Sequence, residues 1–371
     1  MKKSLIALAV LGTASGFAAA QSNVTVYGSM DAGVTASHFE HKDTTYSMSD
    51  GNWLSNQIGI KGTEDLGGNN QVFFNLVQGF KLSNGEVNNG PTGGQFNRES
   101  AMGVKGDWGL VAFGRFGGLS SDTGSYSILG GSAYATSFAT IGNLGSAFIL
   151  APRANNAVAY ASPEFGGAQI YAAYSNGVEE DDNKWSKNEH YYGIGGVYTA
   201  GNFSANAIWE MYDNKTSDAD ASNVFTLGAQ YDFGAFTLYG AYQYALNSSA
   251  IPTGGDASLG DFYADAANKG IKKGVNQNAF SLSVSAPVAG GTASLQGQFA
   301  FGKFKNGSRL VADVEDDYNV WSVGTSYVYP LSKRTSVYAY AAYGDTGKAF
   351  NKAKDLDLSG WNATVGMSHR F

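Results

Sequence analysis

Apolar and polar residues alternate with a period of two in the last segment of the chain. Between Trp361 and Phe371, apolar side chains occupy most odd-numbered positions, and Asn, Thr, Gly, Ser and Arg occupy the even-numbered positions. Successive side chains of a β-strand point to opposite faces of a sheet, so this period predicts a strand with one apolar and one polar face. Similar alternation recurs at 24–35, 203–211, 225–232, 280–285, 294–301 and 321–329. Each run is close to the ~10 residues that a tilted strand needs to cross the apolar layer of a membrane.

Short and long connections alternate between these predicted strands. Seven short turns lie near 64–68, 107–109, 163–167, 201–202, 232–234, 287–291 and 332–334. Eight longer polar segments lie near 37–52, 83–96, 117–152, 177–188, 213–222, 247–275, 303–317 and 345–358. Short turns on one side and long loops on the other are typical of outer-membrane barrels. We therefore predict an all-β fold, a transmembrane antiparallel β-barrel of about 16 strands, whose lumen is too wide for side chains to fill.

Composition supports a barrel over the other classes of membrane protein. The chain has 50 Gly, 13% aromatic residues and only 15% charged residues. Its mean hydropathy of −0.20 is too low for a helical membrane protein but suits strands with one polar face. The absence of Cys excludes a disulfide framework and any cysteine-based metal or redox site.

The first twenty residues have the pattern of a cleaved signal peptide. Lys2 and Lys3 precede an apolar stretch that ends at Phe17, and three alanines at 18–20 match the small-residue cleavage rule. The apolar stretch is shorter than the ~20 residues of a spanning helix. We expect residues 1–20 to be removed and 21–371 to form one barrel domain in the outer membrane of a Gram-negative bacterium.

Charge argues against a nucleic-acid partner. Without Lys2 and Lys3, the 24 basic residues become 22 against 31 acidic residues, which gives a net charge of −9, whereas nucleic-acid binding needs a basic face. Acidic residues concentrate at 179–182, 213–220 and 313–317. They are typical of solvated loops, and they would also allow divalent cations to bridge the protein to anionic outer-leaflet lipid such as lipopolysaccharide.

Catalytic and metal-binding patterns are weak. His38 and His41 lie in the first long loop without a third ligand, which favours solvated side chains over a metal site. A hydrolase would need Ser or Thr, His and an orienting group on one patch, and no strand carries such a set. We predict no catalytic residues, no metal and no cofactor.

Four segments and the terminal residue carry a resemblance to a known family. The segments are 24–34, 59–67, 97–115 and 159–167, and the terminal residue is Phe371. They resemble the general porins of beta-proteobacteria and Neisseria, which are trimeric, 16-stranded diffusion channels. The resemblance implies a homotrimer, a third long loop folded into the lumen, and a final aromatic residue that the barrel-assembly machinery recognises.

Carried over to this chain, the resemblance places the pore constriction at the third long loop. Residues 117–152 would be that loop, and Arg98 and Arg115 would be basic wall residues opposite it. Lys61, in the second-strand motif, joins this set of constriction residues.

The loop departs from the family pattern. Porins of this kind more often have several carboxylates there, whereas Asp122 is its only charged side chain, accompanied by aromatic residues such as Tyr126 and Tyr134. We therefore expect weak charge selectivity.

The sequence leaves the orientation of Arg115 open. This residue has the same parity as Val111 and Phe113, so a bulge or a strand end must turn it inward if it lines the pore. The alternative is an interfacial arginine that extends towards lipid headgroups.

These observations predict a non-enzymatic, water-filled channel for passive diffusion of small hydrophilic solutes and ions. One alternative is a substrate-specific channel, in which Tyr126 and Tyr134 would help to form a stacking track for sugars. The other is a surface adhesin or receptor barrel with acidic loops.

Overall fold

The computed structural model describes residues 23–87, 94–121, 124–128, 147–178, 184–213, 220–248, 274–304, 317–345, 347 and 359–371. The predicted signal peptide and two predicted constriction residues, Asp122 and Tyr134, lie outside these residues. Within the described ranges, no helix has both the length and the apolar character needed to cross a membrane.

Seventeen strands and one short 3-10 helix make up the described part of the chain. The first nine strands are β1 (Asn23–Phe39), β2 (Thr45–Asp50), β3 (Gln57–Gly67), β4 (Asn70–Gly79), β5 (Glu99–Gly106), β6 (Gly109–Gly117), β7 (Arg153–Ala161), β8 (Ala168–Asn176) and β9 (His190–Ala200). The others are β10 (Phe203–Asp213), β11 (Ser222–Asp232), β12 (Thr237–Ser248), β13 (Val275–Val288), β14 (Gly291–Phe304), β15 (Asp317–Pro330), β16 (Thr335–Asp345) and β17 (Gly360–Arg370). The helix η2 (Trp185–Lys187) lies between β8 and β9.

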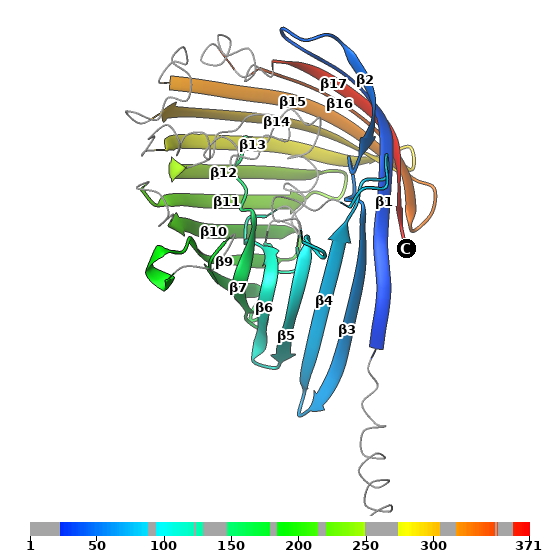
Figure 1. Ribbon diagram of the computed structural model, residues 1–371. Coiled ribbons are helices and arrows are strands. Elements are labelled where there is room, and N and C mark those ends of the chain that lie inside the picture. The colour runs from blue at the N-terminus through cyan, green and yellow to red at the C-terminus, as the bar shows by residue number, and fades with distance from the viewer. Residues whose placement is uncertain are drawn as a thin grey trace, which may run out of the picture.

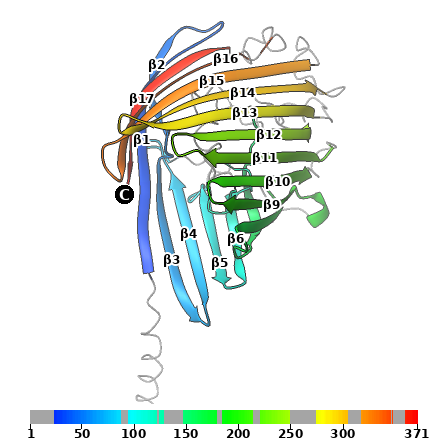
Figure 2. The ribbon, with the colours of Figure 1, turned by 180° about the vertical axis from the view of Figure 1, so that it is seen from behind.

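The strands form one closed antiparallel barrel (Figures 1 and 2). Each strand from β3 to β16 pairs with the next in sequence, and β1 closes the barrel by pairing with β17 on one side. On its other side, β1 pairs with β3 through residues 23–29 and with β2 through residues 32–37. Because β2 and β3 share one position beside β1, the seventeen strands occupy 16 places, which confirms the predicted strand number.

The predicted connections are confirmed with one correction. All seven short turns join consecutive strands, and seven of the eight long segments lie between strands as expected. The first segment, 37–52, was predicted as a loop throughout but contains β2. Cross-strand hydroxyl pairs help to hold β2 against β1, with Ser37 Oγ 2.8 Å from Thr45 Oγ1 and Thr35 Oγ1 2.6 Å from Ser49 Oγ.

The two faces of the barrel have opposite character. Large apolar side chains are exposed on the outer face, for example Leu282 at 62% and Val365 at 62%. Polar side chains of the same strands are buried on the inner face, for example Ser283 at 2% and Thr364 at 2%. This arrangement confirms the alternation predicted from the sequence, and it makes the interior of the barrel polar.

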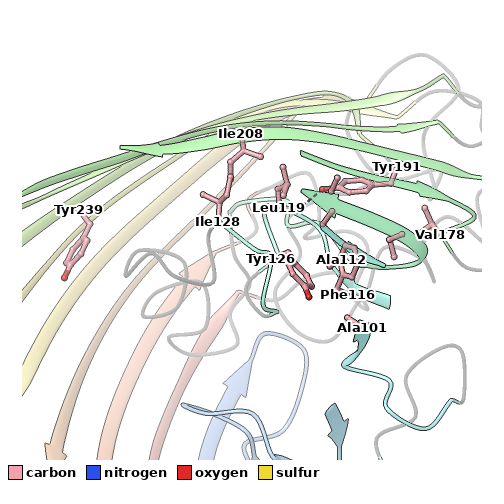
Figure 3. Close-up of a cluster of buried hydrophobic side chains, with 14 of the residues drawn as sticks. Ala101, Ala112, Phe116, Leu119, Tyr126, Ile128, Val178, Tyr191, Ile208 and Tyr239 are labelled. Atoms are coloured by element: carbon pink, nitrogen blue, oxygen red, sulfur yellow. Dashed lines mark hydrogen bonds between the residues drawn. The ribbon is translucent and has the colours of Figure 1, made fainter. Parts of the chain in front are cut away.

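One region of the interior is apolar. A buried cluster gathers residues of β5, β6, β9 and β10 around the start of the third loop, including Phe116, Leu119, Tyr126, Ile128 and Ile208 (Figure 3). An apolar cluster inside a polar barrel shows where the third loop packs against the wall.

Candidate pore constriction

The third loop follows β6 and is first attached to β9 and β10. The backbone N–H of Leu119 donates to the Tyr191 hydroxyl at 2.8 Å, and that hydroxyl donates to Glu210 Oε1 at 2.6 Å. The backbone N–H of Ser120 also donates to Glu210 Oε1, at 3.1 Å. Glu210 is only 2% exposed, and its carboxyl group provides acceptors for a loop backbone that has left the sheet.

A second attachment joins the loop to β5 through Glu99. Ser125 donates to Glu99 from its backbone N–H at 3.0 Å and from its hydroxyl at 2.7 Å. Asn75 of β4 donates to Glu99 Oε1 at 2.7 Å and accepts from the Tyr27 hydroxyl at 2.7 Å. A continuous set of hydrogen bonds therefore runs from β1 across the inner wall to the loop.

The returning end of the loop is held by three glutamines on the far wall. Gln243 of β12 accepts from the Ile149 N–H at 2.7 Å and donates to the Ile149 carbonyl at 2.8 Å. Ala147 donates to Gln298 Oε1 at 2.7 Å, and its carbonyl accepts from Gln277 at 2.9 Å. These amide groups replace the neighbouring strand that the loop backbone lacks. The bonds to opposite walls confirm that the third loop folds into the barrel.

Apolar contacts seal the start of the loop against the wall. Phe116 and Tyr126 meet edge to face with ring centroids 4.7 Å apart, and Ile128 lies beside Ile208 (Figure 3). The Ile128 N–H donates to the Leu119 carbonyl at 2.8 Å. This packing holds the described part of the loop against the inner wall of the barrel.

Tyr126, predicted as a pore-lining residue, is packed rather than open to the lumen. Its side chain is 5% exposed against Phe116. Burial and the nearby charge of Glu99 raise the pKa of Tyr126, so the phenol stays protonated at physiological pH. With Tyr126 enclosed, the stacking track that would favour a sugar-specific channel lacks one of its rings.

Arg98 lies on the inner face of the barrel. Its side chain covers Gly79 of β4, where a Cβ would lie 3.2 Å from Arg98 Cδ and 3.3 Å from Cζ. Gly79 has the same inward parity as Asn75 in the unbroken register with β3. The absence of a side chain at Gly79 therefore allows the guanidinium to lie against the wall of the lumen.

Arg115 and Arg153 reach the same part of the wall. Arg115 donates to the Asn97 carbonyl at 2.8 Å and to Asn155 Oδ1 at 2.6 Å, and Arg153 donates to the Arg98 carbonyl at 3.0 Å. Three arginines thus meet where β5, β6 and β7 approach the third loop. The sequence analysis did not name Arg153. Its place directly after Pro152, at the first residue of a strand that follows the third loop, would have indicated a side chain near the loop.

A bulge lies beside Arg115, but its extra residue is on the neighbouring strand, so the alternation of β6 is unbroken and Arg115 keeps the parity of Phe113. The β6–β7 register shifts between Gly114, which pairs with Ala157, and Phe116, which pairs with Ala154. Asn156 takes a left-handed conformation with φ of 50° at this bulge. The two protein acceptors of Arg115 favour a side chain fixed to the barrel over one extended towards headgroups.

Lys61 faces the lumen at some distance along β3. It pairs with Thr25 of β1 and Asn75 of β4, and its ammonium lies 4.9 Å from the centroid of the Tyr27 ring. A cation above an aromatic face is held by the ring quadrupole. The structure therefore places Lys61 beside the hydrogen bonds that lead to Glu99, and its part in the constriction stays a prediction.

The far wall of the barrel carries no charge between the ends of its strands. From β11 to β17 the described charged residues lie at or beside strand ends, for example Asp232, Lys303, Asp317 and Arg370. The buried inner face there carries Ser, Thr, Gln, Asn and Tyr together with Ala and Val. In the described residues, no group of three or more His, Cys, Asp or Glu could hold a metal ion. Among the described residues, the charged side chains of the inner wall therefore lie on β1–β10 and at strand ends.

Comparison with known proteins agrees with this geometry. The family model for Gram-negative porins matches residues 7–349. An outer membrane porin protein of Bordetella pertussis is 28% identical over 404 aligned positions, and outer membrane porin protein 32 of Delftia acidovorans is 30% identical over 398, each covering 100% of both chains. The major outer membrane protein P.IB of Neisseria meningitidis is 28% identical over 381, again with full coverage.

Solved structures share the fold. An anion-selective porin from Comamonas acidovorans superposes with a TM-score of 0.64 at 23% identity, covering 95% of this chain and 100% of that one. OmpT of Vibrio cholerae, in a trimer form, gives a TM-score of 0.61 at 16% identity, covering 94% and 99%. With its closed polar-lined barrel and the family match along most of its length, this chain belongs to the Gram-negative porin family and is a channel protein of the outer membrane.

Proposed function

We propose that the channel is a passive, water-filled pore for small hydrophilic solutes and ions, with a weak preference for anions. The observation that carries this proposal is the third loop, which is hydrogen-bonded across a polar lumen to Glu99, Glu210 and Gln243. Such an insertion narrows a lumen that this strand number would otherwise leave wide. Arg98 on the inner face, with Arg115 and Arg153 close beside it at the border of the loop, would supply the anion preference.

Planar-bilayer recording tests both parts of the proposal. Replacing Arg98, Arg115 and Arg153 together by Gln should keep hydrogen-bond donors but remove three positive charges from the narrow part. We expect the chloride-to-potassium permeability ratio, measured from reversal potentials in a salt gradient, to fall by about twofold or more. Arg334→Gln, in the exposed β15–β16 turn, is the control and should leave the ratio unchanged. An unchanged ratio in the triple variant would place these arginines outside the conduction path.

The resemblance and the shared fold support a homotrimer in the membrane. An outward-facing hollow on β1, β16 and β17 is lined by small side chains, among them Ala36, Ala339, Ala341 and Ala363. Small residues allow two apolar surfaces to approach closely in lipid. After extraction from the membrane into detergent, three barrels should therefore stay together until the sample is heated.

The trimer prediction has a direct test. Ala341→Trp should fill the hollow and convert unheated samples from trimer to monomer mobility on gels, whereas Ala207→Trp, on the outer face of β10, should not. Wild-type protein that migrates only as monomer at every detergent strength would contradict the trimer, and a trimeric Ala341→Trp variant would contradict this contact surface.

Two further partners follow from the sequence and the resemblance. The acidic loops would bind lipopolysaccharide through divalent cations, since carboxylate oxygens are good ligands for such ions. The terminal Phe371 would be recognised by the barrel-assembly machinery.

A further inference from the structure

A second segment leaves the sheet beside β1, which β3 and β4 separate from β5 in the order of the barrel. Residues 51–56 connect β2 to β3, and both strands pair with β1, yet the six residues between them form no pairs with it. Asp31 of β1 explains their course. Asp31 directly follows Met30, whose side chain points outward and is 41% exposed, whereas the Asp31 side chain is 0% exposed. The side chain that fixes the segment therefore points into the barrel.

Asp31 binds the backbone of this segment at three successive residues. Its carboxyl oxygens accept from the N–H of Asn52 at 3.0 Å, Trp53 at 3.2 Å and Leu54 at 3.0 Å. The Asp31 N–H in turn donates to Asn56 Oδ1 at 2.5 Å. Three consecutive N–H groups around one carboxyl group form a closed backbone turn, and hydrogen bonds to a carboxyl group are among the stronger ones.

The same segment reaches across β17 to β16. The Tyr338 hydroxyl donates to Asp31 Oδ1 at 2.6 Å, and the Tyr340 hydroxyl donates to Asn52 Oδ1 at 3.2 Å. Trp53 stacks on Tyr338 with centroids 6.2 Å apart. Gly366 of β17 makes this reach possible, because a Cβ there would collide with the Tyr338 ring and hydroxyl. Figure 1 shows β1, β2, β16 and β17 side by side, as their pairings require.

We propose that residues 51–56 form a second narrowing of the channel, latched to the inner wall by Asp31, in addition to the third loop. The inference rests on the proposed channel function and adds to it a positioning residue and a further lining segment. Trp53 is half-buried and is the bulkiest side chain of the segment. It extends the narrowing from β1 over the inner surface of β17, and Asp31 and Tyr338 keep it from moving within the lumen.

Cysteine labelling tests the lining, because the chain has no native Cys. We expect a charged, water-soluble thiosulfonate to lower the single-channel current of Trp53→Cys in irreversible steps, since the modified side chain adds bulk and charge to the conduction path. Leu331→Cys, in the exposed β15–β16 turn, is the control and should be labelled without a change in current. Labelling of Trp53→Cys without a change in current would overturn the proposal.

The latch is tested by the rate of the same modification. Asp31→Asn removes acceptors from the turn, and Gly366→Ala displaces Tyr338 from the other side; each should raise the modification rate at Trp53→Cys about tenfold. Gly297→Ala is the matched control, because a Cβ there has open space around it. Unchanged rates in both variants would overturn the latch, and Gly366→Ala keeps the test valid if Asp31→Asn fails to assemble. Failure of wild-type protein to conduct would instead refute the channel function.

Discussion

Removing residues 132–140 from the third loop should raise single-channel conductance about twofold or more and admit larger oligosaccharides, because the narrowest cross-section governs a short pore. This deletion keeps the two attached ends, Ser125 with Glu99 and Ala147 with Gln298. The nine residues left between Ile128 and Ala147 can span up to roughly 30 Å at ~3.3 Å each. Bilayer recording and liposome swelling measure the two effects.

A control deletion separates pore size from general damage. Removing nine residues, 256–264, from the connection between β12 and β13 shortens a predicted exterior loop by the same amount. It should leave conductance and size cutoff unchanged. A correctly assembled 132–140 deletion with the parent conductance would show that the loop does not set the cutoff.

Deleting Phe371 should lower the amount of protein in the outer membrane at least several-fold, while the surviving channels keep their conductance. Phe371 exchanges two backbone hydrogen bonds of 3.1 Å with Gly28, and its ring lies over that glycine on the outer face. Burial of the ring contributes only about 1.5–3 kcal/mol. The larger part of the expected loss would come from the proposed recognition of the terminal aromatic residue by the assembly machinery.

Immunoblotting of outer-membrane fractions measures this effect. Phe371→Trp keeps an aromatic terminus and should preserve the level. Phe236→Ala is a matched control, because Phe236 is 38% exposed and Phe371 39%, and it too lies at the short-turn end of the strands. Normal levels after deletion of Phe371 would refute its role in assembly.

The strands and their connections were predictable because the information is local. Each strand is long enough for its alternation to be read, and each short turn carries Gly, Asn or Asp. β2 was missed because it is only six residues long, and its apolar positions are just Tyr46 and Met48. The interruption between β2 and β3 depends on Asp31, whose hydrogen-bond partners lie more than twenty residues away along the chain. No local sequence pattern therefore shows this interruption.

The site was predictable only in outline. Arg98 and Lys61 lie on the inner wall, and the third loop enters the lumen, whereas the part of both residues in the constriction stays a prediction. Its attachments could not be derived, because Gln243 and Glu99 look like any other polar side chains on an inward face until the loop is placed. Ile208 was the usable signal: an apolar residue on the polar face of β10 indicates that something apolar covers it, and Ile128 does so.

The pairing of β1 with β17 has a consequence for the order of events in folding. Residues 29–39 bond to residues 360–370, so the first strand must wait for the last before its free edge is closed. Until then, both edges of the growing sheet present unpaired backbone groups, each of which costs several kcal/mol in hydrocarbon. Contacts this distant along the chain also form slowly. The sheet therefore cannot enter lipid strand by strand as it emerges, and we expect insertion to depend on shelter for the two edges until they meet.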